Sequence, residues 1–402
     1  MYRDCRKPLF LLLVPIVIAL ALAGCERPKE ARTLTIALAV FPDEASRYRF
    51  LLHDFESREH VKVNLIAQSY GDILRALLAE ATAHRGRLDI VELDLAALGR
   101  AHEAARDLEA VVSPQARSLF PRAAWDAARF GDHVRFVPHR LMWQAMIYNR
   151  VRVPNPPRTW DELLAFARAH PGKVALKAAR YEGATCDMLC FVWAAGGDLL
   201  APRSFGALRA FDFLTDLAPY LNLESSVFRE MSVLEAQARG SVWIHFNWPF
   251  AIQYLASKGL APRVDLSAPI PVGPSGAATP LGGGYLAIPV SAPHPELAAR
   301  FLQYLLAADV QRRLSGELGW YGSVAPPEGS EEARLYSGFA AMRPYVKARP
   351  TIACYSELSN SWQRAFRAVL VDGIGPVAAL DRVASFARTE AMQDATRDCE
   401  CH

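Results

Sequence analysis

The chain has 402 residues, too many for one ordinary hydrophobic core, so we expect two lobes. Hydrophobic residues make up 51% and charged residues 22% of the chain, as in a well-folded globular protein. The formal net charge of +3 falls to about +1 when residues 1–24, which carry a net +2, are removed. Such a small charge argues against nucleic acid as a partner.

The N-terminus has the pattern of a secretory signal. Basic residues at positions 3–7 precede an apolar run over 9–23 that is short for a spanning helix. The run ends in Leu-Ala-Gly-Cys25, which matches the lipobox of bacterial lipoproteins. We therefore expect a signal peptide over 1–24, a lipid on Cys25, a polar tether over 25–32 and an extracytoplasmic protein, periplasmic or at the cell surface, held to the membrane. An uncleaved signal anchor is the alternative.

Cys5 would be lost with the signal peptide and Cys25 would carry the lipid, so five of the seven cysteines remain. Outside the cytoplasm Cys354 could pair with Cys186 or Cys190, and buried free thiols are an equal alternative. Cys399-Glu400-Cys401-His402 could bind a soft metal, but four residues at a chain end are more typical of a disordered tail. We therefore predict a tail over 392–402 and no metal site.

The first part of the mature chain alternates strands and helices. Apolar runs at 33–40, 61–67 and 88–93 predict strands, with helical spacing between them. This order predicts a parallel sheet with helices on its faces. Ligands of such sheets bind beyond the carboxyl ends of the strands, where Glu44 and Asp94 stand. For Glu44, a helix N-terminal acid that interacts with the macrodipole is an equal alternative.

The middle of the chain predicts a second set of elements. Pro138 lies in an extended segment, and Thr159 with Glu162 predicts a capped helix start that makes Trp160 a core residue. A strand over 172–178 leads into the turn Tyr181-Glu182-Gly183. A later strand, from Gly240, delivers Trp248 to a candidate binding site.

The stretch 281–314 combines a glycine-rich segment, a short strand and a helix. Three glycines, 282–284, let a ligand or another strand approach the backbone closely, and Tyr285 follows at once. A short strand then ends at Pro289, and a helix with one apolar face begins near Ser291.

The order of these segments resembles the sugar-carrying extracellular solute-binding proteins of bacterial ABC importers, of the trehalose and maltose type. The resemblance extends from about residue 33 to about residue 391. Besides the stretch 281–314, it rests on Asp89-Ile90-Val91 with Asp94, Phe136-Val137-Pro138, Ile147-Tyr148-Asn149, Thr159-Trp160-Asp161-Glu162-Leu163 and Tyr181-Glu182-Gly183.

The resemblance implies an α/β, two-lobe periplasmic-binding-protein fold of type II, with a mainly parallel sheet in each lobe. Three hinge crossings are expected near Pro138, Gly284 and Ser323. The implied division places 33–138 and 282–323 in an N-lobe, and 139–281 and 324–391 in a C-lobe.

The resemblance also implies a sugar site between the lobes. Carboxylates would accept hydrogen bonds from sugar hydroxyls and aromatic rings would cover the apolar sugar face. For each aromatic ring the alternative is ordinary core, and for Glu182 a solvent-facing loop acid. The candidate ligand-binding residues are Tyr285, Trp248, Asp94, Glu44, Glu182, Gly283, Gly284, Trp143 and Trp320.

No catalytic motif stands out: a G-x-S-x-G elbow, a P-loop, a dinucleotide fingerprint and H-E-x-x-H are all missing from the sequence. We therefore expect a monomeric binding protein without cofactor, whose partners are a sugar and a transmembrane ABC permease. Two alternatives stay open. One is a binder of a charged solute, such as a polyamine or a phosphate ester, and the other is a glycoside hydrolase that uses paired carboxylates.

Overall fold

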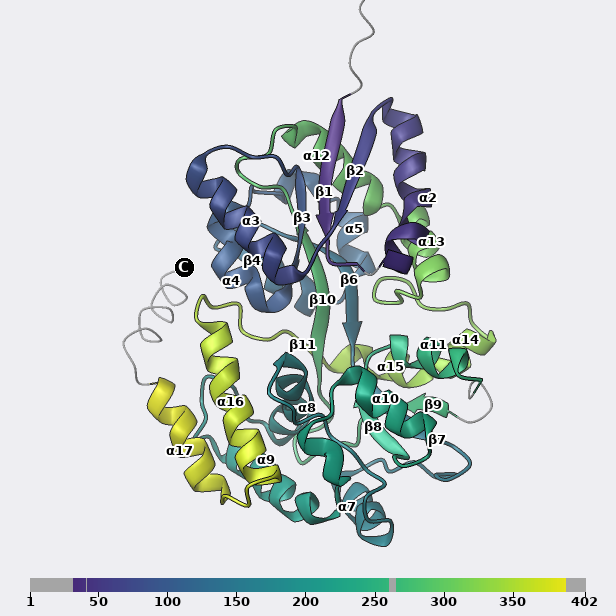
Figure 1. The fold of residues 1–402 in the computed structure, drawn as a ribbon, viewed down its shortest axis with the longest axis vertical. Helices are drawn as coiled ribbons and strands as arrows, with labels where there is room; N and C mark the ends of the chain where they lie inside the picture. Colours follow the sequence, from purple (N-terminus) through teal and green to yellow (C-terminus); the bar gives the residue numbers. More distant parts are fainter. Residues whose placement is uncertain (1–31, 41, 260–264, 388–402) are drawn as a thin grey trace, which may run out of the picture.

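A computed structural model describes residues 32–40, 42–259 and 265–387. In the upper half of Figure 1, the N-lobe, one sheet has the order β11-β10-β3-β1-β2, and β6 pairs with β10. β1 pairs in parallel with β2 and β3, as predicted, whereas β10 runs antiparallel to β3 and β6. The strands are β1 (Thr33–Leu38), β2 (Lys62–Ala67), β3 (Ile90–Asp94), β6 (Val137–Trp143), β10 (Thr279–Ala287) and β11 (Val346–Lys347).

Helices cover this sheet with their apolar faces. The helix after β10 begins at Pro295 with His294 as its N-cap, not at Ser291, but its predicted apolar face is buried. The N-lobe elements are α2 (Pro42–Glu59), α3 (Tyr70–Ala83), η1 (Leu95–Ala97), α4 (Leu98–Ala101), η2 (His102–Ala104), η3 (Glu109–Val111), α5 (Pro114–Leu119), α6 (Arg122–Ala128), α12 (Pro295–Leu305) and α13 (Ala308–Leu318), with the hairpin β4 (Arg129–Phe130) and β5 (His133–Val134).

The lower half of Figure 1, the C-lobe, contains a smaller sheet with the order β8-β7-β9. Both pairings are antiparallel, so the expectation of a mainly parallel sheet is wrong for this lobe. The predicted strand over 172–178 is reduced to isolated parallel bridges from Val174 to Leu221 and Ile244. The strands are β7 (Ala145–Asn149), β8 (Ile244–Asn247) and β9 (Asp265–Ala268).

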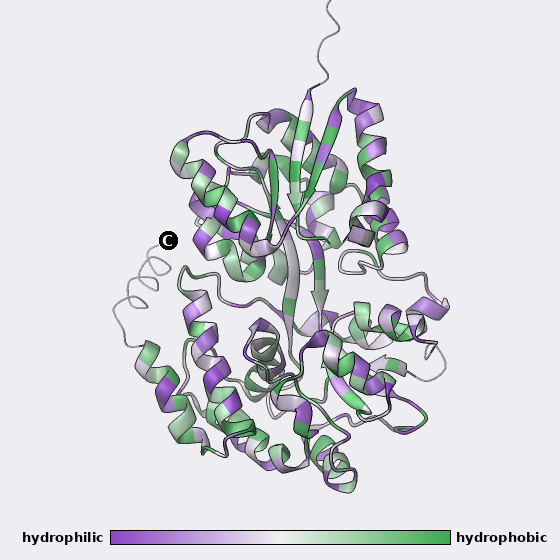
Figure 2. Cartoon of the chain, viewed as in Figure 1, coloured by the Kyte–Doolittle hydropathy of each residue, from purple (hydrophilic) through white to green (hydrophobic). Residues whose placement is uncertain are grey.

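Most of the C-lobe is helical, and Figure 2 shows hydrophilic and hydrophobic residues sharing its outer helices. Its helices are α7 (Trp160–Ala169), α8 (Glu182–Val192), η4 (Trp193–Ala195), α9 (Phe205–Leu217), η5 (Ala218–Tyr220), η6 (Leu223–Ser226), α10 (Glu230–Ala238), α11 (Phe250–Ser257), α14 (Glu331–Leu335), α15 (Ser337–Met342), η7 (Arg343–Tyr345), α16 (Tyr355–Leu370) and α17 (Pro376–Ala387).

Two long strands, β6 and β10, pass from one lobe into the other side by side (Figure 1). A further connection leads from α13 in the N-lobe to α14 in the C-lobe. These passages lie where the sequence predicts crossings near Pro138, Gly284 and Ser323. The segment after α15 also returns to the crossing strands, because β11 pairs with the start of β10.

Within the part of the chain that the structure describes, no helix is long and apolar enough to cross a membrane. The predicted signal peptide, the predicted lipidation site Cys25 and most of the predicted tether lie outside the described residues, as does the predicted C-terminal tail.

Candidate functional site

The three glycines of β10 make room for the chain itself. A Cβ on Gly282 would come within 2.7 Å of the Trp248 ring, and one on Gly284 would overlap the carboxyl of Glu92. Gly283 has φ +109°, and a Cβ there would overlap the carbonyl of Arg140 on the neighbouring strand. Side chains of both lobes and the crossing strand β6 therefore pack on this segment, and Gly283 and Gly284 serve close packing of the protein rather than contact with a ligand.

Tyr285 is a core residue. Its side chain is fully buried, and its hydroxyl donates a hydrogen bond of 3.1 Å to the Ala124 carbonyl of α6. Desolvation by burial raises the pKa of this phenol. The expectation that Tyr285 stacks on a ligand is therefore wrong for this structure, and its alternative, a ring packed under the interlobe strand, describes what is seen.

Two predicted tryptophan plates are also packed inside the protein. The Trp143 indole Nε1 donates a 2.7 Å hydrogen bond to the Phe339 carbonyl, and its ring is buried. The Trp320 ring is nearly buried and lies 5.2 Å from the guanidinium carbon of Arg140. Trp143 belongs to the core, and Trp320 covers a charged cluster of the N-lobe.

Trp248 lies at the lobe boundary. It follows β8, packs against Gly282 of the crossing strand and donates from Nε1 to Glu230 Oε1 over 3.4 Å. The carboxyl of Glu230 also lies against Gly183, beside Glu182. Trp248 is only 8% exposed, but it reaches the N-terminus of α8 through Glu230 at the lobe boundary, and because of this position it stays a candidate ligand residue.

An arginine that the sequence analysis did not single out anchors the N-lobe carboxylates. Arg140 Nη1 lies 3.3 Å from Glu44 Oε2, and Arg140 Nε lies 3.2 Å from Glu92 Oε1. Its Nη2 donates to the Ala39 carbonyl and to the Tyr70 hydroxyl, at 2.5 and 3.0 Å. Glu44 also stands in the first turn of α2, so it combines a helix-terminal position with an ion pair.

Glu92 carries the buried negative charge of this cluster. Burial by itself would raise its pKa, but the charge of Arg140 and a hydrogen bond with His139 bring the pKa down to about 2. Ala39 N donates to the second carboxyl oxygen over 2.8 Å. A carboxylate with this many donors stays ionised although it is fully buried.

A second arginine joins the two lobes. Arg349, between β11 and α16, places Nη1 2.5 Å from Glu182 Oε1 at the start of α8 and Nη2 3.4 Å from Asp94 Oδ1 at the end of β3. Asp94 and Glu182, which the sequence predicts as site residues in different lobes, are thus brought together through Arg349. We name Asp94, Arg349 and Glu182 the interlobe triad.

The acceptors of the triad are already engaged. Glu182 Oε1 also accepts from the Tyr355 hydroxyl at 2.5 Å, and Oε2 accepts from Ser359 Oγ at 2.6 Å. Asp94 Oδ1 caps η1 by accepting from Ala96 N. Arg349 is 3% exposed, and its Nε is buried without a hydrogen-bond partner.

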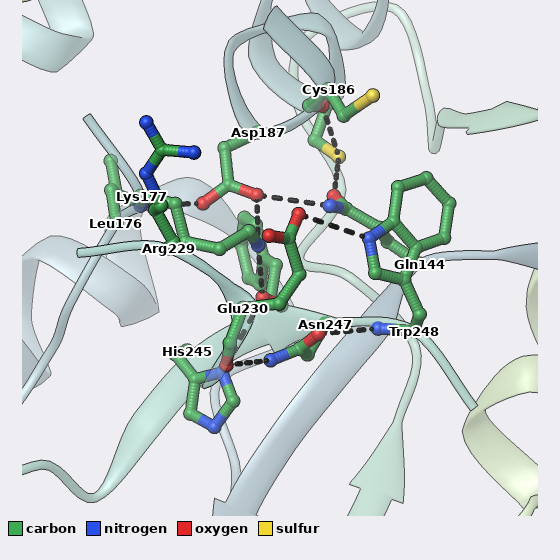
Figure 3. A network of polar contacts seen from close by, with 12 residues as sticks. Gln144, Leu176, Lys177, Cys186, Asp187, Arg229, Glu230, His245, Asn247 and Trp248 are labelled. Atoms are coloured by element: carbon green, nitrogen blue, oxygen red, sulfur yellow. Dashed lines mark hydrogen bonds and ion pairs between the residues drawn. The ribbon is translucent and has the colours of Figure 1, made fainter. Parts of the chain in front are cut away.

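A third charged cluster lies wholly inside the C-lobe (Figure 3). Lys177 Nζ lies 2.5 Å from Asp187 Oδ1 and also donates to the Phe246 carbonyl. Gln144, between the crossing strand β6 and β7, donates to the same carboxyl over 3.0 Å. Burial raises the pKa of Asp187, and the charge of Lys177 opposes the shift. Neither charged side chain of the pair is exposed.

The cysteines of this lobe are thiols. Cys186 and Cys190 are buried and unpaired, so neither forms the disulfide with Cys354 that the sequence left open. Cys190 Sγ contacts the Gln144 side chain instead, at 3.4 Å. Burial raises the pKa of both thiols. No group of three metal-ligating side chains is assembled anywhere in the described ranges.

A signal for Arg140 was available in the sequence, and one for Arg349 was not. Arg140 and its neighbour His139 interrupt a mainly apolar strand, Val137–Trp143, and a charge on a buried strand requires a partner. Arg349 stands in an irregular segment with no periodicity to place it. Its two carboxylates are 255 and 167 residues away along the chain.

Known proteins share this chain's sequence pattern and fold. Residues 51–342 match the model of the family described as "Bacterial extracellular solute-binding protein". A "Probable ABC transporter-binding protein" of Deinococcus radiodurans is 26% identical over 258 residues, which are 56% of this chain and 60% of that protein. The match thus spans less than two thirds of the length of this relative.

Solved structures share the fold over nearly their whole length. Maltose-bound MalE3 of T. maritima has a TM-score of 0.75 at 22% identity and covers 89% of this chain and 99% of its own. The cyclic alpha-maltosyl-1,6-maltose binding protein of Arthrobacter globiformis reaches 0.78 at 20%, covering 90% and 100%. A solute-binding protein of Thermotoga lettingae bound to alpha-D-tagatose reaches 0.74 at 21%, covering 89% and 99%.

Proposed function

The chain belongs to the family of bacterial extracellular solute-binding proteins, and on this premise we propose that it captures a mono- or disaccharide between its lobes and delivers it to the permease of an ABC importer. One observation carries the proposal. Carboxylates from both lobes, Asp94 and Glu182, converge on one guanidinium at the lobe boundary. Movement of one lobe against the other would therefore change this polar centre directly.

The surroundings of the triad suit a sugar. Recognition of a sugar needs charged acceptors and donors for its hydroxyls and an aromatic surface for its C–H face. The partly exposed carboxylates of Asp94 and Glu182 offer acceptors for the hydroxyls. Trp248, connected to the start of α8 through Glu230, offers the second. Proteins that share the fold are described as binding maltose, a cyclic maltosyl-maltose and tagatose, which supports a carbohydrate here.

Calorimetric titration of the mature protein with mono- and disaccharides tests the proposal. We expect saturable binding of at least one sugar and none of spermidine or glycerol 3-phosphate. Binding of spermidine or the phosphate ester in place of every sugar would contradict the proposed substrate class. Release of free monosaccharide from a glycoside during long incubation would indicate a hydrolase instead.

The membrane attachment is a separate part of the proposal. We propose that Cys25 is lipidated after removal of residues 1–24 and that 25–32 tethers a monomer to the membrane. Cys25→Ser should release the protein from the membrane fraction or leave it unprocessed. A variant that partitions and migrates like the wild type would refute the lipobox interpretation.

A further inference from the structure

If the proposed function is correct, the charges of the interlobe triad influence which solutes the site binds. Asp94 and Glu182 contribute two negative charges and Arg349 one positive charge. The side chains of both carboxylates are partly exposed, at 29% and 34%, whereas the Arg349 side chain is 2% exposed. The guanidinium is therefore a fixed internal counter-ion between two acids that face solvent at the lobe boundary.

Arg349 is held in this position from several sides. Its Nη1 and Nη2 contact carboxylates of different lobes, and its guanidinium carbon lies 5.8 Å from the Tyr355 ring centre. Tyr355 and Ser359, on α16, hold the Glu182 carboxylate from the other side. A planar, permanently charged fork shared by two acids loses little freedom when it forms each hydrogen bond.

We infer that Arg349 is a specificity-determining residue: it offsets one of the two negative charges, engages the carboxylates of both lobes, and so disfavours cationic solutes in a site that takes an uncharged polyol. A polyamine requires surplus negative charge at the point where it binds. With Arg349 present, each acid already has a cation within hydrogen-bond reach, and an amine would have to displace it. Without Arg349, two carboxylates from opposite lobes face each other with no counter-ion and attract an amine.

The test compares Arg349→Gln with wild type by calorimetry, using spermidine and the best neutral sugar of the panel. We expect the variant to bind spermidine at least about tenfold more tightly than wild type at low salt, and to lose this gain at about 0.5 M NaCl, where charges are screened. Sugar affinity should fall by about tenfold or more, because a charge-assisted donor is lost.

Arg343→Gln is the matched control. Arg343 also reaches from the C-lobe to the N-lobe, but its Nη2 donates to the neutral Leu119 carbonyl over 3.0 Å. The substitution Arg343→Gln removes the same charge from the protein but leaves no carboxylate without its counter-ion, so spermidine affinity should not change. The double variant Arg349→Gln/Glu182→Gln should lose the increased spermidine affinity of the single variant, because removing one acid returns the net charge of the triad to its wild-type value.

A second experiment replaces the two acids instead of the arginine, and therefore does not depend on the folding of Arg349→Gln. Asp94→Asn with Glu182→Gln leaves Arg349 as the surplus charge, so glucuronate should bind at least about tenfold more tightly than to wild type. Spermidine binding by wild type, or unchanged ion preference in both the Arg349 and the double-acid variants, would overturn the inference. A wild type that binds no sugar refutes the proposed function alone, because the shift in ion preference is measured separately.

Discussion

Two ion clusters of this protein use the same kinds of charged groups in different places. The Lys177–Asp187 pair lies inside the C-lobe, with both side chains fully buried and further hydrogen bonds from Gln144 and to the Phe246 carbonyl. The interlobe triad joins residues of both lobes through Arg349, and its acids are partly exposed. A cluster inside one lobe keeps its geometry when the lobes move, whereas a cluster between lobes cannot.

The different locations of the two clusters predict which substitutions affect folding stability and which affect solute binding. Removing one partner inside a lobe leaves a buried, uncompensated charge, which destabilises the fold. Removing one partner between the lobes changes the charge at the point where we propose that solute binds. Residues within a lobe should therefore alter unfolding, and residues at the boundary should alter affinity.

The largest expected effect is on the within-lobe pair. Asp187→Ala leaves Lys177 buried without its carboxylate and should lower the free energy of unfolding by about 3–5 kcal/mol, measured by urea denaturation. The surface pair of Arg158 and Glu162 serves as the control, because Arg158→Ala in this solvent-exposed i,i+4 pair should change the free energy of unfolding far less. Similar losses in the two variants would mean that the buried cluster has no special structural role.

Tyr285→Ala tests the reassignment of the predicted ligand ring. Since the side chain of Tyr285, a residue of β10, is fully buried, loss of its ring should lower the free energy of unfolding of the ligand-free protein by about 3–5 kcal/mol while sugar affinity changes little. Thermal melting without ligand and calorimetry on the same variant provide the two values. Unchanged melting together with lost affinity would return Tyr285 to the binding site.

Trp248→Ala should show the opposite balance. Trp248 stands at the boundary, so truncation should weaken sugar binding by about 1–3 kcal/mol, which is roughly five- to 150-fold in Kd. Melting of the protein without ligand should fall less than in Tyr285→Ala. Equal affinity in Trp248→Ala and wild type would leave the site without its proposed aromatic surface.

A further expected effect is a pH dependence inside the C-lobe. Burial first, and then the charge of Lys177, lower the pKa of His245 to about 3. The unfolded chain protonates this histidine near pH 6.5, so its contribution to stability is complete above that pH and is lost as the pH falls toward 3, at about 1.4 kcal/mol per pH unit. His245→Gln should flatten the urea stability profile between pH 6 and 4. An equally steep profile in the variant would exclude His245 as its source.

Much of the fold was predictable because it depends on local patterns. The strands that became β1, β2 and β3 and the capped helix start at Thr159 follow from hydrophobic periodicity and capping chemistry. The crossing near Pro138 was expected from the family resemblance. The antiparallel C-lobe sheet was not predicted, because strand direction depends on pairing between β7, β8 and β9, which are far apart in sequence.

The candidate site was predictable only in part. Asp94 was proposed because it follows a predicted strand, and Glu182 because its turn resembles one in the family; in the structure both contact Arg349. Tyr285 was misplaced because a glycine-rich approach to the backbone looks the same in sequence whether a ligand or the protein fills the space. Arg349 was missed because its partners come from two other parts of the chain.

Small-angle X-ray scattering with and without the sugar identified by calorimetry tests the central claim most directly, because that claim is that two lobes move around a captured solute. We predict that saturating sugar changes the radius of gyration of wild type, decreasing it as the lobes close. At a sugar concentration that saturates wild type but lies below the weakened Kd of Trp248→Ala, the scattering profile of that variant should change less than that of wild type. A wild-type profile identical with and without saturating sugar would contradict the claim that binding and lobe movement are coupled.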